Sequence, residues 1–227
     1  MSEIMLLGDS IACGLTYDSA AGKYALCRDA FAQALRTMGV NVKNLARIGC
    51  TIDTAQTLFE KAPKHEGAIL AVELGGNDSD LNWSEVAQNP DIYHEAKVAL
   101  NDFKLRLTGI LEAAKKACMK PVVVTPLPVA ARKYFEWFSK NLDSLSILRY
   151  LGSIDYIYRW QERYALAAQS AAASVNCPIF DLRSIFLLRK DFEDLMCEDG
   201  IHPTAQGQAL IRDEVVKYYS AHVPGSV

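Results

Sequence analysis

The hydrophobic positions of the chain alternate between two patterns. Five short, nearly continuous apolar runs are typical of strands that are buried on both faces: residues 4–7, 40–44, 68–73, 121–125 and 178–182. Between these runs apolar residues recur at helical spacing, which predicts helices over residues 31–38, 99–114, 159–175 and 205–219. Because strands that alternate with helices are joined by right-handed crossovers, the sequence predicts an α/β fold with a doubly wound parallel sheet.

Composition and charge narrow the class of protein. Of the 227 residues, 50% are hydrophobic and 22% are charged, which excludes a disordered or low-complexity chain. With no internal repeat or linker in the sequence, we expect one domain over residues 1–227. The net charge of −3 indicates neither a nucleic-acid partner nor an anionic membrane surface. No run approaches the roughly 18 apolar residues that a membrane span requires.

The amino-terminal residues and the cysteines bear on the compartment. Residues 1–7 hold only a short apolar run, without the basic segment or cleavage site of a secretory signal. We therefore expect a cytoplasmic protein, although a leader removed beforehand would leave the same sequence in a secreted one. Six cysteines without a CxxC pair are typical of reduced, mostly buried thiols in such a compartment: Cys13, Cys27, Cys50, Cys118, Cys177 and Cys197.

Polar residues follow three predicted strands at the edge where parallel sheets bind ligands. Gly8-Asp9-Ser10 comes after the first strand, where Ser10 is either a nucleophile at a helix start or only the helix cap. Gly49 follows the second strand, and its N–H either approaches a substrate oxygen or belongs to an ordinary turn. After the third strand, Asn77 offers an amide donor and Asp78 a brace for the loop, although both are also common turn residues.

A base must accept the proton of Ser10, and the pair Asp199 and His202 follows the fifth strand. Asp199 is placed to orient the His202 ring, although such a pair also occurs in ordinary loops. Asp91 and His94 have the same spacing after the third strand. However, Asn89-Pro90-Asp91 predicts a helix start, where Asp91 would be a cap, so we favour His202. The two remaining histidines are expected at the opposite edge of the sheet: His65 and His222.

Taken in order, these segments resemble the sequence blocks of the SGNH, or GDSL-type, hydrolase family. The resemblance spans residues 8–203 and is carried by Gly8-Asp9-Ser10, Gly49, Gly75-Gly76-Asn77-Asp78 and Asp199-Gly200-Ile201-His202-Pro203. It implies that Ser10 is the nucleophile, that His202 is the general base and then the acid, and that Asp199 orients the ring. It also implies an oxyanion hole formed by the N–H groups of Ser10 and Gly49 and the side-chain amide of Asn77.

The resemblance further implies a flavodoxin-like three-layer α/β/α sandwich with a five-stranded parallel sheet in the order 2-1-3-4-5. The expected activity is hydrolysis of small-molecule carboxylic esters through an acyl-enzyme intermediate, with no cofactor and no metal. Acetylated carbohydrates and lipid-like acyl compounds are both candidate substrates. Two alternatives stay open, namely an acyltransferase with the same site and a non-catalytic module that binds acylated glycans or a protein partner.

Other enzyme classes lack support in the sequence. It has no HExxH or CxxC segment for a metal, no GxxxxGK[ST] or GxGxxG segment for a nucleotide, and no GxSxG segment of an α/β-hydrolase.

An aromatic-rich insertion follows the fourth strand. Residues 134–160 contain 8 of the chain's 21 aromatic residues. We interpret this segment as a structural embellishment, as a lid or pocket wall, or as a homodimer surface. Its Tyr134 and Trp137 are candidate substrate-binding residues. Further candidates border the nucleophile or follow the third and fourth strands: Asp9, Asp78, Leu81, Trp83 and Leu127.

Overall fold

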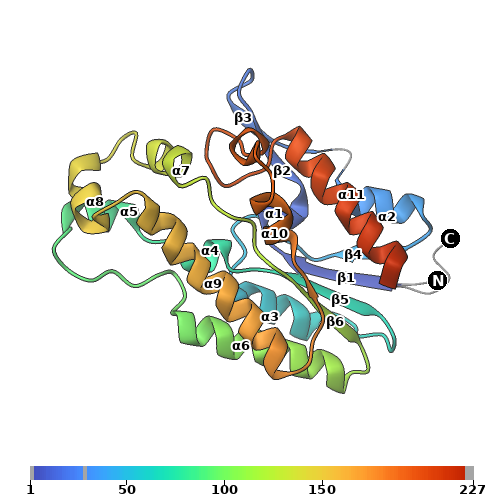
Figure 1. The fold of residues 1–227 in the computed structure, drawn as a ribbon. Coiled ribbons are helices and arrows are strands. Elements are labelled where there is room, and N and C mark those ends of the chain that lie inside the picture. Colours follow the sequence, from blue (N-terminus) through green and yellow to red (C-terminus); the bar gives the residue numbers. More distant parts are fainter. Residues whose placement is uncertain (1–2, 28–29, 223–227) are drawn as a thin grey trace.

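The computed structural model describes residues 3–27 and 30–222 of the chain. Its centre is a parallel sheet (Figure 1) of the strands β1 (Glu3–Gly8), β4 (Asn41–Asn44), β5 (Ile69–Glu73), β6 (Lys120–Val124) and β7 (Ile179–Phe180). Their spatial order is β4-β1-β5-β6-β7, which reads 2-1-3-4-5 when these five strands alone are numbered along the chain. The predicted α/β fold with a five-stranded parallel sheet is therefore confirmed.

Helices cover both faces of the sheet and complete three layers (Figure 1). One face packs against α3 (Ile52–Lys61), α6 (Leu100–Lys116) and α9 (Asp155–Ser174), and the other lies beneath α2 (Phe31–Thr37) and α11 (Ala205–His222). Side chains alternate between these layers along each strand. In β5, Leu70 and Val72 belong to the core on the α6 side, whereas Ile69 and Ala71 face the α11 side.

An antiparallel hairpin lies outside the main sheet, and the sequence pattern does not predict it. Its strands β2 (Leu15–Asp18) and β3 (Lys23–Leu26) follow the short helix α1 (Ser10–Cys13). All four residues of β3 are exposed, so no buried apolar run marks this strand. The hairpin lies beyond the carboxyl end of β1, close to α1 (Figure 1).

Two predicted elements have different boundaries in the structure. The sequence predicts a fifth strand over residues 178–182, but β7 ends at Phe180 because the Asp181 side chain caps α10 (Leu182–Leu187). The predicted helix start at Asn89-Pro90-Asp91 is wrong. Asn89 instead ends α5 (Trp83–Gln88), and residues 90–98 contain no helix. Polar and proline residues punctuate both ends of helices, so this local pattern did not distinguish the two.

The aromatic-rich insertion folds into α7 (Ala131–Phe138), α8 (Ser144–Leu151) and the first turns of α9. It packs against α5, where the Phe138 ring stacks on Trp83 with centroids 4.1 Å apart. Most of its aromatic side chains are partly buried against the core on the α6 side. The insertion therefore forms a wall beside the carboxyl end of the sheet rather than a separate unit.

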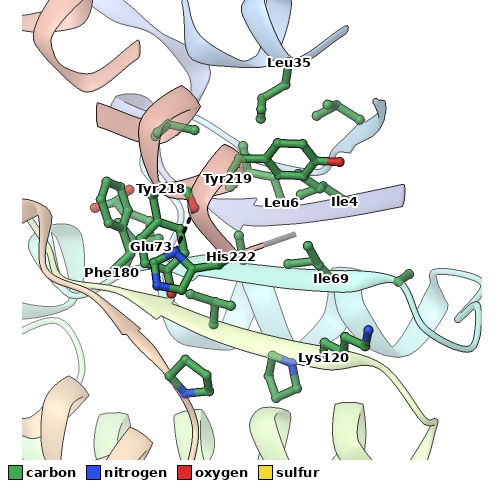
Figure 2. A pocket seen from close by; sticks show the side chains of 18 of the residues that line it. Ile4, Leu6, Leu35, Ile69, Glu73, Lys120, Phe180, Tyr218, Tyr219 and His222 are labelled. Carbon is green, nitrogen blue, oxygen red and sulfur yellow. Dashed lines mark hydrogen bonds between the residues drawn. The ribbon is translucent and has the colours of Figure 1, made fainter. Parts of the chain in front are cut away.

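A large apolar cavity lies between the sheet and α11 (Figure 2). It has a volume of about 1080 Å³, and its walls include Ile69 and Phe180 of the sheet and Tyr218 of α11. Val122 of the inner strand β6 lines it and is only partly buried as a result. This face of the sheet is thus packed more loosely than the α6 face. Within the described part of the chain, no helix is both long and apolar enough to cross a bilayer.

Candidate active site

Three side chains from distant parts of the chain meet beyond the carboxyl end of β1. Ser10 is the first residue of α1, and its Oγ lies 2.9 Å from Nε2 of His202. On the other side of the ring, Nδ1 lies 2.6 Å from Oδ2 of Asp199. All three residues are buried. The fold therefore brings a hydroxyl, an imidazole and a carboxylate into one hydrogen-bonded line.

Hydrogen bonds and a close backbone contact fix the conformation of the loop that carries Asp199 and His202. Oδ1 of Asp199 accepts the backbone N–H groups of Ile201 and His202, both at 3.0 Å. Gly200 has a φ of +72°, and a Cβ at this position would lie 2.4 Å from the backbone nitrogen of Tyr134. Only glycine fits here. The loop therefore docks tightly on the start of α7, which aims His202 at Ser10.

The carboxyl group of Asp199 is ionised in this environment. Burial raises its pKa, but the hydrogen bonds from His202 and the backbone N–H groups, together with the charge of His202, lower it more. The net pKa lies below its usual value. An ionised Asp199 keeps the proton of the neutral ring on Nδ1, so Nε2 is left to accept the proton of Ser10.

Tyr24 of the hairpin also contacts this carboxylate, and the sequence analysis did not identify it. Its hydroxyl donates to Oδ2 of Asp199 at 2.9 Å, and its ring lies edge-on to His202 with centroids 5.2 Å apart. The segment from Leu15 to Leu26, with apolar ends around a glycine-containing turn, was the only signal that a hairpin reaches the site.

Asn77 and Asp9 lie next to the serine. Asn77 belongs to the short helix α4 (Gly76–Ser79), and its Nδ2 donates to Oδ2 of Asp9 at 3.0 Å. The other oxygen of Asp9 accepts the N–H of Ile11 at 2.8 Å and so caps α1. Asp9, Ser10 and Asn77 all line the same cavity. The sequence also missed Glu73, a buried carboxyl that lines this cavity.

Gly49 lies in the turn after β4 rather than in the cavity wall. Its φ is +74° and the residue is exposed. Apart from its chain neighbours, no atom of residues 3–27 and 30–222 lies within 4 Å of the position that a Cβ would occupy. The structure therefore leaves open space on this side of the glycine. Gly49 is not among the residues that line the cavity at Ser10.

The cavity above Ser10 is small and mainly apolar. Its volume is about 100 Å³. Four residues that the sequence analysis predicts to bind substrate line it: Leu81, Trp83, Leu127 and Tyr134. Tyr156 and Trp160 of the insertion line it as well. The Tyr134 hydroxyl and the Trp83 Nε1 both donate to Oδ1 of Asp80, at 2.6 and 2.9 Å. This shared acceptor holds the two aromatic walls in place.

Two predicted substrate-binding residues lie away from the cavity. Trp137 packs edge-on against Tyr17 of the hairpin, with centroids 4.9 Å apart. Asp78 is fully buried, and its Oδ1 accepts the N–H of Ile52 at 2.8 Å, which ties α4 to α3. Burial raises the pKa of Asp78 to about 7. Its contacts match the predicted brace for the loop.

The other histidines have partners of their own. His94 lies in the loop after α5, where Nε2 is 2.9 Å from the carbonyl oxygen of Asn89 and the ring packs on Tyr150. His65 pairs with Glu3 before β5, and His222 ends α11. In residues 3–27 and 30–222, no group of three or more His, Cys, Asp or Glu side chains is arranged to hold a metal ion.

The chain is similar to known hydrolases in sequence and in fold. The profile of the GDSL-like lipase/acylhydrolase family matches residues 6–210. A lipase/acylhydrolase from Enterococcus faecalis is 19% identical with a TM-score of 0.66, covering 97% of this chain and 96% of that one. An acetyl xylan esterase from Geobacillus stearothermophilus is 17% identical with a TM-score of 0.63, covering 95% and 93%. A search of curated proteins finds no match.

Proposed function

Because the chain belongs to the GDSL-like lipase/acylhydrolase family, we propose that it is a serine esterase that uses Ser10 as its nucleophile. The observation that carries this proposal is the hydrogen-bonded line from Ser10 through His202 to Asp199. Such a line lowers the cost of removing the serine proton, because the base is within hydrogen-bond reach and its ring is fixed by a carboxylate.

The proposed reaction proceeds in two steps. Ser10 Oγ attacks the ester carbonyl while Nε2 of His202 takes its proton, and the imidazolium then protonates the leaving alcohol. This leaves an acyl group on Ser10. His202 next takes a proton from a water molecule, which attacks the acyl carbonyl. The imidazolium then returns that proton to Ser10 Oγ as the ester bond to Ser10 breaks, which releases the carboxylic acid and regenerates Ser10. Asp199 stabilises the imidazolium in both steps.

The negative charge of each tetrahedral intermediate needs donors close to Ser10. We assign this role to the N–H of Ser10, the side-chain amide of Asn77 and the N–H of Gly49. Asn77 uses one of its two N–H bonds for Asp9, and the second is available to an oxygen in the cavity. The assignment of Gly49 rests on the family resemblance, because the residue lies in the turn after β4 and does not line the cavity. A single donor of this kind contributes about 2.7–4 kcal/mol.

The size of the cavity favours a short acyl group. Its volume of about 100 Å³ is far below the 1080 Å³ of the cavity beneath α11. An acetyl group fits this space against Leu81 and Leu127. One structural neighbour is an acetyl xylan esterase, so acetylated carbohydrates are the first natural esters to test. Because Tyr134, Tyr156 and Trp160 line the cavity, the insertion is better explained as a pocket wall than as a dimer surface.

The proposal is tested with a chromogenic acetyl ester and a fluorophosphonate probe. We expect wild-type protein to hydrolyse the ester and to be labelled, and Ser10→Ala to lose both while remaining folded. Ser19→Ala, at an exposed serine of the hairpin turn, is the matched control and should behave as wild type. A wild-type protein that is neither labelled nor active would contradict the proposal and favour a binding module. If the protein is labelled and transfers the acyl group to an added alcohol faster than to water, it is an acyltransferase.

The acyl preference is tested with a series of esters of increasing chain length. We expect kcat/KM to fall by at least about tenfold between the acetyl and the octanoyl ester, because a longer chain does not fit the cavity. Equal or better turnover of the octanoyl ester would overturn the short-acyl assignment without affecting the role of Ser10.

A further inference from the structure

Glu73 is a buried carboxyl group that the proposed reaction leaves without a role. It is the last residue of β5, is paired in register with Gly8 of β1, and is 4% exposed. A Cβ on Gly8 would lie 3.6 Å from Oε2 of Glu73, so the carboxyl group lies directly against the segment that leads to Ser10. Among the described residues, Oε2 has no hydrogen-bond partner. Figure 2 shows Glu73 at the wall of the large apolar cavity, and it also lines the cavity at Ser10.

The neighbour of Glu73 is a second buried carboxyl group, that of Asp9, which is 3% exposed. No lysine or arginine forms a salt bridge with either residue in the described part of the chain. Glu73 is paired in register with Gly8, the residue before Asp9, so two buried carboxyl groups are neighbours here. Burial and mutual repulsion oppose a negative charge on both. The two groups therefore share one proton.

The hydrogen bonds decide which residue holds that proton. Both oxygens of Asp9 accept N–H groups, from Ile11 at 2.8 Å and from Asn77 at 3.0 Å. Burial raises the pKa of Asp9, but these hydrogen bonds and the charge of His202 lower it and so favour the ionised form. Glu73 accepts only the backbone N–H of Asp9, and its Oε2 has no partner among the described residues. Burial, and then the charge of Asp9, raise the pKa of Glu73 well above its usual value. Glu73 is therefore the neutral acid and Asp9 the anion.

We infer that Glu73 is a positioning residue for the oxyanion hole: as a neutral acid it donates a hydrogen bond to Asp9, which in turn holds the amide of Asn77. With one N–H of Asn77 held by Asp9, the second is left to donate to a substrate oxygen in the cavity that Asn77 lines. This inference rests on the proposed esterase function, since it assigns Asn77 to the oxyanion hole. The neutrality of Glu73 matters as well, because a second negative charge here would oppose the charge that develops on the substrate oxygen.

The contact is tested by replacing Glu73 with two side chains of nearly the same length. Glu73→Gln keeps a neutral hydrogen-bond donor, whereas Glu73→Met removes it and keeps the shape. We expect Glu73→Gln to retain kcat within about threefold of wild type and Glu73→Met to lose at least about tenfold, with KM within about twofold for both. A merely structural role would lower the apparent kcat only through a smaller folded fraction, so kcat is calculated per molecule that the fluorophosphonate probe labels. Glu73→Leu takes the place of Glu73→Met if the latter does not fold.

A second readout does not depend on activity. The side-chain amide protons of Asn77, assigned by their loss in Asn77→Asp, should keep their NMR shifts in Glu73→Gln and move in Glu73→Met. Equal shifts in both variants, or equal kcat in both, would overturn the inference. If wild-type protein shows no esterase activity, the proposed function fails, and the NMR comparison alone decides whether Glu73 holds Asn77 through Asp9.

Discussion

The hydroxyl of Tyr24 donates a hydrogen bond to Oδ2 of Asp199 at 2.9 Å, and the same oxygen lies 2.6 Å from Nδ1 of His202. The carboxylate therefore accepts four hydrogen bonds, two on each oxygen. Burial and the charge of Asp199 raise the pKa of Tyr24, so this hydroxyl keeps its proton and remains a donor. The hairpin thereby takes part in holding the carboxylate that orients His202.

Removing this hydroxyl should change the behaviour of His202. In Tyr24→Phe the carboxylate loses a donor and attracts the imidazolium more strongly, so we expect the acidic limb of kcat/KM to move to higher pH. Activity at neutral pH should fall by about 3- to 10-fold. The pH dependence of acetyl ester hydrolysis measures both effects. Tyr17→Phe, in the neighbouring strand, is the control, and an unchanged pH profile in Tyr24→Phe would show that the contact has no effect on the histidine.

The choice between the two histidines of matching spacing is open to direct test. His202→Ala should reduce kcat by about 10⁴-fold or more, because the ring is the base within reach of Ser10. His94→Ala should stay within a few-fold of wild type, since its ring contacts Asn89 and Tyr150. Steady-state kinetics on both folded variants give the answer. Loss of turnover in His94→Ala alone would reverse the assignment.

Asp78 should make stability depend on pH. Its folded pKa of about 7 lies above the usual value, so its favourable contribution is complete at low pH and is lost as the pH rises through about 7. Asp78→Asn removes this dependence while keeping an acceptor for the N–H of Ile52. The free energy of unfolding of the variant minus that of wild type should be higher at pH 8 than at pH 4, by on the order of 3 kcal/mol.

Urea unfolding at the two pH values measures this difference. The control is Asp102→Asn, which replaces an exposed aspartate on α6 and should show no such change. If Asp78→Asn and wild type lose stability in parallel, Asp78 is not the titrating group.

Replacing Gly200 or Gly22 by alanine distinguishes the cost of backbone strain from the cost of a steric clash. Both have positive φ, but a Cβ at Gly200 meets the backbone at 2.4 Å, whereas none of the described atoms lies within 4 Å of a Cβ at Gly22. Gly22→Ala should cost only the backbone strain, about 1 kcal/mol. Gly200→Ala should cost at least about 3 kcal/mol and displace His202. Chemical unfolding and ester hydrolysis test both expectations, and equal costs would contradict the docking of this loop.

The cavity beneath α11 should accept an added methylene. Val122 faces this cavity and is partly buried, whereas Val72 lies in the tightly packed core on the other face. Val122→Ile should therefore stabilise the protein by about 0.5–1 kcal/mol, and Val72→Ile should destabilise it by about 1 kcal/mol. Thermal unfolding distinguishes them. Destabilisation by Val122→Ile would mean that this face is already filled.

The local sequence pattern predicts some helices and strands correctly and misplaces the ends of others. The stripe of Phe103, Leu107 and Ile110 predicts α6 because one face of a helix must be apolar to be buried. The helix start predicted at Asn89-Pro90-Asp91 is wrong, because the same residue types occur at both ends of helices. Asp181 ended β7 early because its side chain satisfied the N–H of Ser184, and a short apolar run does not disclose such a cap.

By itself the sequence determined the parallel sheet and the edge at which Ser10, Asn77 and His202 gather. The spacing of hydrophobic residues, the handedness of crossovers and the direction of strands are local or near-local properties of the chain, so the sequence pattern discloses them. Only the tertiary structure decided that Tyr24 reaches Asp199, that Glu73 lies against Asp9, and that Trp137 packs on Tyr17 instead of lining the cavity. These contacts join residues far apart in sequence. They depend on how a hairpin and an insertion pack over the sheet, and no spacing of residue types encodes that geometry.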